Sequence, residues 1–106
     1  MKLKTFNKPT LIVIAGPTAV GKTKFCLNLA KKYQTSIISA DSRQFYRELK
    51  IGTAAPTEQE LQTVPHYFIA HLSIHDYYST SRFEQDVLQL LPSLFQQNQV
   101  VIMTGG

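Results

Sequence analysis

Four short apolar segments recur along the chain and are separated by more polar stretches. They occupy residues 11–15, 36–40, 67–72 and 100–104. An unbroken apolar run of this length that is rich in β-branched residues is typical of a strand in a parallel sheet. The sequence therefore predicts four strands, and the run at 11–15 is expected to be buried on both faces.

Helical spacing of apolar residues follows the first of these segments. Between residues 21 and 33, apolar side chains fall at positions 25, 26, 29, 30 and 33, with lysines and polar residues between them. This stripe predicts an amphipathic helix whose apolar face includes Cys26.

Two further helices are predicted from capping boxes, in which a hydroxyl and a carboxylate satisfy the first backbone amides of a helix. One match lies at 57–60 and predicts a short helix that ends by residues 64–65; the other lies at 81–84 and predicts a longer helix. Pro92 falls inside the longer helix. Because proline lacks the amide hydrogen of the helical ladder, we expect a kink or a restart near residues 90–93.

Strands that alternate with helices predict an α/β fold with a mainly parallel sheet and flanking helices. A chain of 106 residues has room for one hydrophobic core, and no repeat or linker divides it, so residues 1–106 are expected to form a single domain. The chain stops directly after the fourth predicted strand, where such folds continue into a loop and a helix. We therefore expect this domain to be partial.

Composition excludes several classes of protein. With 43% apolar and 17% charged residues, the chain is neither disordered nor collagen-like, and its single cysteine excludes an intramolecular disulfide framework. No apolar run reaches the roughly 18 residues of a membrane span. The basic start lacks a signal-peptide cleavage site, so a cytoplasmic protein without a membrane partner is expected.

Positive charge is concentrated in the first forty residues. They contain seven lysines and no acid, and because the whole chain carries +4, residues 41–106 carry −3. Such a basic segment is suited to phosphates, on a nucleic acid or on a small molecule, although solubility alone would also account for it.

Residues 16–23 match the phosphate-binding pattern G-x-x-x-x-G-K-[ST] at every fixed position. The predicted strand before them and the predicted helix after them are the context that this loop requires. Its amides and the positive end of the helix stabilise an anion, while the Lys22 ammonium adds a full charge at the outer phosphates. The Thr23 hydroxyl is a candidate ligand of Mg²⁺. The motif predicts a P-loop NTPase-like fold, truncated here after about four strands.

A polar group at residues 41–44 follows the predicted strand 36–40. Open α/β sheets bind ligands at the carboxyl ends of their strands, so Asp41 and the phosphate loop should face one cleft. There Asp41 can accept a proton, Arg43 can bind a phosphate, and Gln44 can read the edge of a base. A capping or turn role for Asp41 is equally compatible with its position. The strand at 100–104 ends without an acid, so either Asp41 serves the metal or the chemistry differs from nucleotide hydrolysis.

Five motifs together resemble the tRNA dimethylallyltransferase family, also called the tRNA isopentenyltransferases. They are the loop 16–23, Ser-Ala-Asp-Ser-Arg-Gln-Phe-Tyr at 39–46, Ile-Gly-Thr-Ala-Ala-Pro-Thr at 51–57, Val-Pro-His at 64–66, and the glycine pair at 105–106. A generic P-loop protein would match only the first. The resemblance implies transfer of a dimethylallyl group from its diphosphate to N6 of the adenine beside the anticodon.

The resemblance also implies a role for each matching residue. The loop would hold the diphosphate of dimethylallyl diphosphate, with Thr23 on Mg²⁺ and Lys22 neutralising the leaving group. Asp41 would act as general base on the adenine amine, and with Lys22 and Thr18 it completes the candidate catalytic residues. The residues implied to bind the donor are Gly16, Pro17, Thr18, Ala19, Val20, Gly21, Lys22 and Thr23; those implied to contact the anticodon stem-loop of tRNA are Asp41, Ser42, Arg43 and Gln44.

The family's chain continues past residue 106 into further strands, an insertion that clasps tRNA and a later arginine at the diphosphate. We therefore expect the 106-residue piece alone to be inactive and the full-length protein to be a monomer. Two positions depart from the family pattern, since Ala55 stands where lysine is usual and Ala70 stands where an acid is common.

Two other functions are compatible with the same residues. One is a P-loop small-molecule kinase, with ATP in the loop and Asp41 as base for an acceptor hydroxyl. The other is a noncatalytic fragment that only binds diphosphate. Dimethylallyl transfer would release pyrophosphate in the presence of tRNA, whereas a kinase would form ADP.

Three histidines and several aromatic residues complete the candidate chemistry. His66 and His71 differ in strand parity and are expected on opposite faces, and no Cys or carboxylate cluster joins them to His75, so a metal site is not expected. His66 matches the family's Val-Pro-His, which favours a structural or substrate-lining role. The aromatic residues at 45, 46, 67, 68, 77 and 78 can stack on bases, but core packing is the commoner fate of such residues.

Overall fold

The computed structural model describes residues 6–16, 20–41, 45–47, 56–69, 71–73 and 75–105. Within these ranges, helices and strands alternate along the chain as the sequence predicts. In chain order they are β1 (Thr10–Ile14), α1 (Val20–Tyr33), β2 (Ile37–Ser39), α2 (Glu58–Leu61), β3 (His66–Tyr67), α3 (Thr80–Gln97) and β4 (Val100–Thr104).

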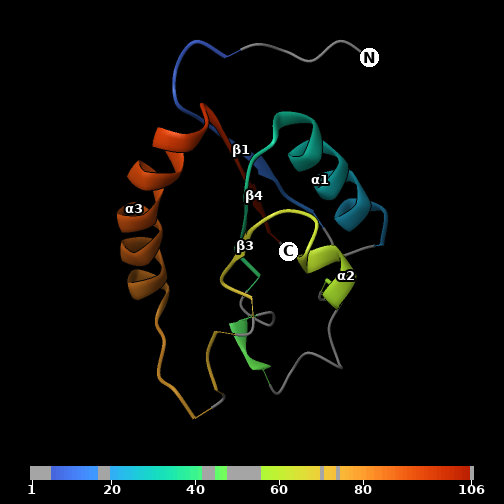
Figure 1. Ribbon diagram of the computed structural model, residues 1–106. Coiled ribbons are helices and arrows are strands. Elements are labelled where there is room, and N and C mark those ends of the chain that lie inside the picture. Colours follow the sequence, from blue (N-terminus) through green and yellow to red (C-terminus); the bar gives the residue numbers. More distant parts are fainter. Residues whose placement is uncertain are drawn as a thin grey trace.

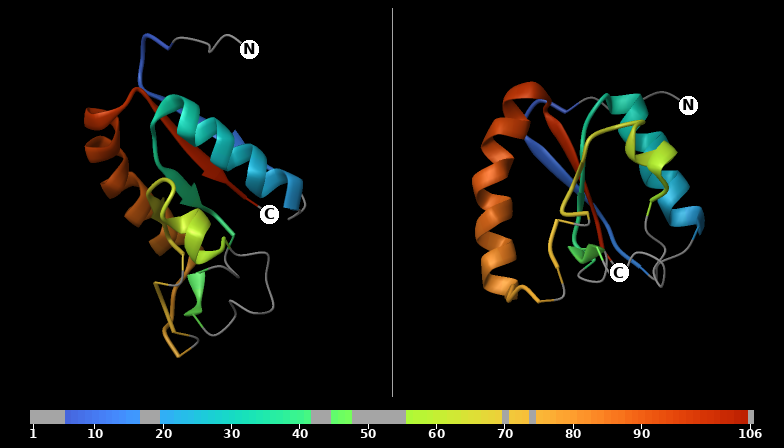
Figure 2. Two further views of the ribbon diagram at one scale, coloured as in Figure 1. Left: turned by 45° about the vertical axis from the view of Figure 1, so that its right-hand side comes forward. Right: turned by 60° about the horizontal axis from the view of Figure 1, so that its bottom comes forward.

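The strands form one parallel sheet in the order β1-β4-β2-β3, with α1 on one face and α3 on the other (Figures 1 and 2). The predicted α/β fold with flanking helices is therefore confirmed. Because consecutive residues of a strand point to opposite faces, β2 and β4 supply both halves of the core. The buried side chains are Cys26, Leu27, Ala30, Ile37, Val64 and Ile102 on the α1 face, and Ile38, Val87, Leu94 and Val101 on the α3 face.

The first strand differs from its prediction, because β1 is not buried on both faces, and among the described residues it pairs with β4 alone. Ile12 and Ile14 pack against the α1 face of the core, and Leu11 packs against the α3 face. Val13, however, is 59% exposed. An apolar run indicates that a strand is suited to burial. How much of the strand is buried depends on the strands and helices that pack beside it.

The third strand is shorter than the predicted run 67–72. β3 contains only His66 and Tyr67, and Phe68 has a φ of +67°. A positive φ takes the backbone out of the extended conformation, so the strand ends there. Pairing resumes only at Leu72, which forms an isolated parallel bridge with Tyr46.

The two predicted capping boxes have different outcomes. At α2 the box is confirmed, because the Thr57 hydroxyl accepts from the Glu60 amide (3.1 Å) and the Glu60 carboxylate accepts from the Thr57 amide (2.9 Å). The box at 81–84 is wrong, since α3 begins two residues earlier with Ser79 as its N-cap. The Ser79 hydroxyl accepts from the Arg82 amide at 3.1 Å. Consecutive hydroxyl residues leave the helix start ambiguous in the sequence, and packing of the helix on the sheet decides it.

Pro92 lies inside α3 without ending it, so of the expected kink or restart near residues 90–93 the restart is wrong, and the kink stays a prediction. The helix runs continuously from Thr80 to Gln97. Pro92 is exposed, and Leu88, whose carbonyl lacks a helical partner because of the proline, is 68% exposed. Water can therefore hydrate the Leu88 carbonyl, which reduces the cost of the missing hydrogen bond.

The buried face of α1 also differs from the apolar stripe predicted from the sequence. Phe25, predicted on the inner stripe of α1, is 57% exposed, whereas Leu27, outside that stripe, is buried. Cys26 and Ala30 are buried as predicted. Tyr77 is 87% exposed and does not take part in core packing.

The Asn98 side chain joins the end of α1 to the start of β4. Its amide group donates to the carbonyls of Tyr33 (2.6 Å) and Gln34 (3.2 Å), and its carbonyl accepts from the Val100 amide (2.9 Å). We expect Asn98→Ala to lower the free energy of unfolding by about 1–3 kcal/mol, because the partly buried hydrogen bonds to the Tyr33 carbonyl and the Val100 amide are lost. Urea denaturation measures this loss. Ser93→Ala, at an exposed site on α3, should change stability by about 0.5 kcal/mol or less, and equal effects of the two changes would contradict the role of Asn98.

Candidate functional site

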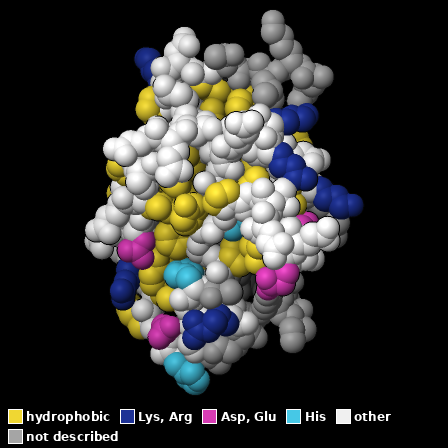
Figure 3. All heavy atoms as spheres, in the orientation of Figure 1, with side chains coloured by type: hydrophobic (Ala, Val, Ile, Leu, Met, Phe, Trp, Pro, Cys, Tyr) yellow, Lys and Arg dark blue, Asp and Glu magenta, His cyan; other side chains and the backbone are white. Residues whose placement is uncertain are grey.

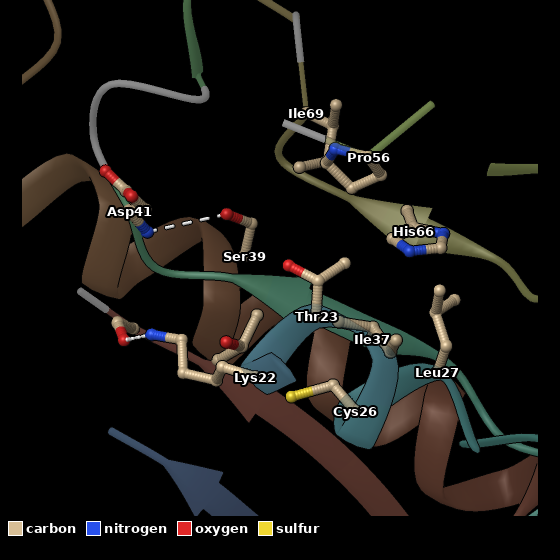
Figure 4. A pocket seen from close by; sticks show the side chains of 12 residues that line it. Lys22, Thr23, Cys26, Leu27, Ile37, Ser39, Asp41, Pro56, His66 and Ile69 are labelled. Carbon is tan, nitrogen blue, oxygen red and sulfur yellow. Dashed lines mark hydrogen bonds between the residues drawn. The ribbon is translucent and has the colours of Figure 1, made fainter. Parts of the chain in front are cut away.

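A pocket lies between the start of α1 and the carboxyl ends of β2 and β4 (Figure 4). The fold creates it because parallel strands end at one edge of the sheet, and α1 begins at that edge after the phosphate loop. Its walls come from α1, from β2 and the end of β4, and from residues on the side of β3. The lining residues are Lys22, Thr23, Cys26 and Leu27 of α1; Ile37, Ser39, Asp41, Thr104 and Gly105 at the strands; and Pro56, His66 and Ile69 on the remaining side.

Lys22 brings its charge to the ends of two strands. Its Nζ donates to the carbonyl of Gly16 at 2.8 Å and to the carbonyl of Gly105 (Figure 4). These carbonyls follow β1 and β4, so the ammonium lies at the mouth of the phosphate loop. The loop motif predicts that a lysine at this position binds an anion.

The phosphate loop is described in part. Gly16 has a φ of +139°, a conformation that residues with a Cβ rarely adopt, so the loop requires glycine at its first position. Val20 and Gly21 form the first turn of α1. The predicted donor-binding residues Pro17, Thr18 and Ala19 lie outside the described residues.

Positive charge on α1 divides between this site and the surface. Lys22 is half-buried, whereas Lys24, Lys31 and Lys32 are exposed. Figure 3 shows Lys and Arg side chains along the side of the molecule where α1 lies. Of the lysines on this helix, Lys22 alone lines the pocket.

Asp41 and the phosphate loop face one pocket, as predicted from the edge of the sheet. Asp41 follows β2 and its amide donates to the Ser39 hydroxyl at 3.4 Å. Ser39 is almost fully buried and lines the same wall. Figure 4 shows the Thr23 hydroxyl on the side of the pocket where Ser39 and Asp41 lie. Ser39 is not among the site residues predicted from the sequence, although strand alternation sets positions 37, 39 and 41 on one face.

The oxygen donors of this wall fit Mg²⁺. Thr23 and Ser39 supply hydroxyls and Asp41 supplies a carboxylate, which are the hard ligands that Mg²⁺ prefers. Magnesium commonly takes one or two protein oxygens and completes its shell with substrate phosphates and water. No group of three or more His, Cys, Asp or Glu side chains gathers in the described part of the chain.

Other predicted positions fall outside the part that the structure describes. These are the candidate tRNA contacts Ser42, Arg43 and Gln44, and the two departures from the family pattern, Ala55 and Ala70.

His66 lines the pocket because β3 pairs with β2. In this pairing His66 lies opposite Ile37, so both side chains face α1. The His66 Nδ1 atom is 2.8 Å from the Val64 carbonyl, and since a carbonyl only accepts, we assign the proton to Nδ1. Burial lowers the pKa of His66, an effect partly offset by the Val64 hydrogen bond and by the charge of Glu60.

Cys26 lies at the floor of the same pocket as a protonated thiol. Burial raises its pKa, while a hydrogen bond with Thr104 and the charge of Lys22 act in the opposite direction. Because the thiolate is the reactive form, this side chain behaves as a small apolar group.

His71 lies in different surroundings from His66. It follows the end of β3, so the predicted strand parity does not apply to it, and its ring packs against Phe45, Phe68 and Tyr78. Burial lowers the pKa of His71, and Asp86 acts in the opposite direction.

The lowered pKa of His66 predicts that the fold is less stable in acid. The pKa of His66 is lower in the folded than in the unfolded chain, so the unfolded chain binds a proton first. Its contribution to stability is fully present above about pH 6.5 and is lost as the pH falls through the folded pKa. We expect the melting temperature to fall as the pH is lowered from 7.5 to 5, and His66→Gln to weaken this dependence. His75→Gln, at an exposed site, is the matched control, and equal slopes for both variants would contradict the prediction.

Comparisons with known proteins show the family of this chain. The chain is 56% identical over 98 residues to tRNA dimethylallyltransferase 1 of Bacteroides thetaiotaomicron, covering 92% of the chain and 32% of that protein. It is 58% identical over 97 residues to the protein of the same name from Bacteroides fragilis, with the same coverage. The chain thus spans about a third of the length of the curated relatives it matches.

Solved structures give the same result for the fold. The crystal structure of a tRNA isopentenylpyrophosphate transferase from Staphylococcus epidermidis is 40% identical, with a TM-score of 0.85. That of the full-length enzyme from Bacillus halodurans is 37% identical, also at 0.85. Each comparison covers 93% of this chain and 33% of the other.

In the ranges that the structure describes, no helix is long and apolar enough to span a membrane. A family model described as IPP transferase matches residues 44–106, more than half of the chain. Because the family model, the relatives and the solved structures all agree, the chain belongs to the IPP transferase family.

Proposed function

We propose that the whole protein transfers a dimethylallyl group from dimethylallyl diphosphate to N6 of the adenine beside the anticodon of tRNA. The observation that carries the proposal is the meeting of Lys22 and Asp41 in one pocket at the carboxyl edge of the sheet. A cation suited to a diphosphate and a carboxylate suited to an amine are the two groups that this transfer needs.

The donor binds through the phosphate loop. The amides at the start of α1 and the Lys22 ammonium stabilise the diphosphate, and Lys22 exchanges its carbonyl partners Gly16 and Gly105 for phosphate oxygens. Thr23, with Ser39 nearby, would hold Mg²⁺, which when bound neutralises charge on the diphosphate. The role of Thr18 follows from the family resemblance alone.

Asp41 receives the proton of the nucleophile. The N6 nitrogen forms a bond to C1 of the dimethylallyl group, the C1–O bond breaks, and diphosphate leaves with the electron pair. One N6 proton passes to the Asp41 carboxylate, which is regenerated when that proton reaches solvent. Ser42, Arg43 and Gln44 follow Asp41 in the chain, and we propose that they contact the anticodon stem-loop.

The proposal also covers the location and oligomeric state of the whole protein and the length of chain that activity requires. We propose that it acts in the cytoplasm as a monomer, and that residues outside these 106 are needed for activity. Dimethylallylation of an anticodon stem-loop by residues 1–106 alone would contradict the last point.

The test is a transfer assay with the whole protein, an anticodon stem-loop RNA, dimethylallyl diphosphate and Mg²⁺. Pyrophosphate and an RNA heavier by one dimethylallyl group are expected in equal amounts. Formation of ADP from ATP with a small acceptor, and no modified RNA, would support the kinase alternative. Thermal stabilisation by diphosphate with no reaction in either assay would support the noncatalytic alternative.

A further inference from the structure

Ser39 is a polar residue at a position of β2 that the sheet buries. Its side chain is 1% exposed, whereas the two residues before it in the strand, Ile37 and Ile38, carry apolar side chains. A buried hydroxyl costs free energy unless it forms hydrogen bonds. Ser39 also lines the pocket that contains Lys22 and Asp41, so its hydroxyl lies within the proposed site.

The Ser39 hydroxyl binds the backbone of Asp41. The register of β2 with β4 ends where Ser39 lies opposite Thr104, and the Ala40 amide donates to the Thr104 carbonyl at 2.7 Å. The next amide along the chain, that of Asp41, donates to the Ser39 hydroxyl at 3.4 Å (Figure 4). A serine that accepts from the amide two residues further on forms a turn in which its side chain replaces a backbone acceptor. Ser39 thus holds the backbone of Asp41 as it leaves the sheet.

Both groups proposed to carry the transfer are tied to the end of β4. The Lys22 ammonium donates to the carbonyl of Gly105, the residue that follows β4. Asp41 follows Ala40, whose amide is bonded to the last residue of β4. The end of this strand therefore sets the ammonium and the backbone before Asp41 relative to each other. The Ser39 bond completes the arrangement, because it restricts rotation of the backbone between Ala40 and Asp41.

We propose that Ser39 is a positioning residue for the proposed base: its hydroxyl holds the Asp41 backbone so that the carboxylate meets the N6 amine of the target adenine. The inference rests on the proposed function, because it requires Asp41 to receive the N6 proton. A serine hydroxyl has two acceptor lone pairs. The bond to the Asp41 amide therefore leaves one of them for the place beside Mg²⁺ that is proposed above.

The first test is Ser39→Ala in the whole protein, with saturating Mg²⁺, dimethylallyl diphosphate and an anticodon stem-loop RNA. The single-turnover rate should fall roughly 2- to 12-fold, which corresponds to the about 0.5–1.5 kcal/mol that one hydrogen bond contributes. The effect should lie in kcat. The Kd of the donor and the KM for the RNA should stay unchanged, because the hydroxyl bond is made to Asp41 and not to either substrate.

The matched control is Ser36→Ala. Ser36 precedes β2 at the opposite end of the strand from Asp41, is 7% exposed, and lines a different pocket. Each change removes one buried hydroxyl from the same segment, so both report any general loosening of β2. Ser36→Ala should keep the transfer rate within about twofold of the unchanged protein, the low end of the effect of one hydrogen bond.

A double-mutant cycle separates a positioning role from other roles of Ser39. When Asp41→Asn is already present, Ser39→Ala should change the residual rate by less than about twofold, because the residue through which Ser39 acts has lost its function. A role of Ser39 in holding Mg²⁺ alone, or in the stability of the sheet alone, would lower the rate equally in both backgrounds and give additive losses.

Several results would overturn the inference. They are an unchanged rate for Ser39→Ala, a loss that lies wholly in KM or in donor affinity, additive losses in the cycle, and equal losses for Ser36→Ala. Melting curves identify a Ser39→Ala protein that has not folded. Ser39→Cys, which keeps the volume of the side chain but is only a weak acceptor, then takes its place with the same expectations. Failure of the unchanged protein to modify the RNA would instead contradict the proposed function, so the two failures are distinguishable.

Discussion

Asp41→Asn in the whole protein is expected to reduce dimethylallyl transfer by about 10²- to 10⁴-fold, the usual contribution of a general base. Asparagine keeps the size of the side chain beside Ser39 but cannot take the amine proton. Binding of dimethylallyl diphosphate should persist or become slightly tighter, because a negative charge next to the anion is removed. Single-turnover transfer and equilibrium binding of the donor measure the two effects separately.

The control for this change is Asp76→Asn. Asp76 is exposed and accepts a hydrogen bond from the Ser73 amide, away from the lining of the pocket. This variant should retain full transfer. If Asp41→Asn kept transfer within about tenfold of the unchanged protein, Asp41 would not be the base.

Lys22→Met should weaken binding of dimethylallyl diphosphate by roughly 10- to 150-fold, corresponding to about 1.5–3 kcal/mol for a lost hydrogen bond to a charged group. Methionine keeps the length of the side chain and removes the ammonium. Transfer should fall further than binding, because charge on the leaving diphosphate grows as the C1–O bond breaks. Isothermal titration with the donor and with inorganic diphosphate measures the loss.

Lys24→Met is the matched control, because Lys24 is two residues away on the same helix and exposed outside this pocket. It removes the same net charge, so any loss shared by both variants reports long-range electrostatics. Raising the salt concentration should diminish that shared part. Equal binding losses for the two variants would contradict a direct role for Lys22.

Several features of the site are readable from the chain because they depend on short stretches of sequence. The spacing of Gly16, Gly21, Lys22 and Thr23 predicts the phosphate loop, and the structure has the expected strand before it and helix after it. Strand 100–104 has the predicted bounds. Thr57 caps its helix as predicted, because a capping box involves only residues three apart.

Features that depend on neighbours distant in sequence could not be predicted in the same way. His66 joins the pocket because β2 pairs with β3, and the register of that pair sets His66 opposite Ile37. The exposure of Val13 depends on the strands and helices that pack beside β1. A further pocket at the start of α3 brings Tyr46 and Glu84 together across 38 positions of the chain.

The sequence by itself determined the α/β class, the phosphate loop and the meeting of Asp41 with that loop at one edge of the sheet. Local spacing is sufficient for these, since loop, helix start and strand end are each specified by adjacent residues. Only the tertiary structure decided the order of the strands, where β3 ends and which side chains complete the pocket around Lys22. These depend on strand order, register and helix packing, and such long-range contacts are chosen by the free energy of the whole core rather than by any one segment.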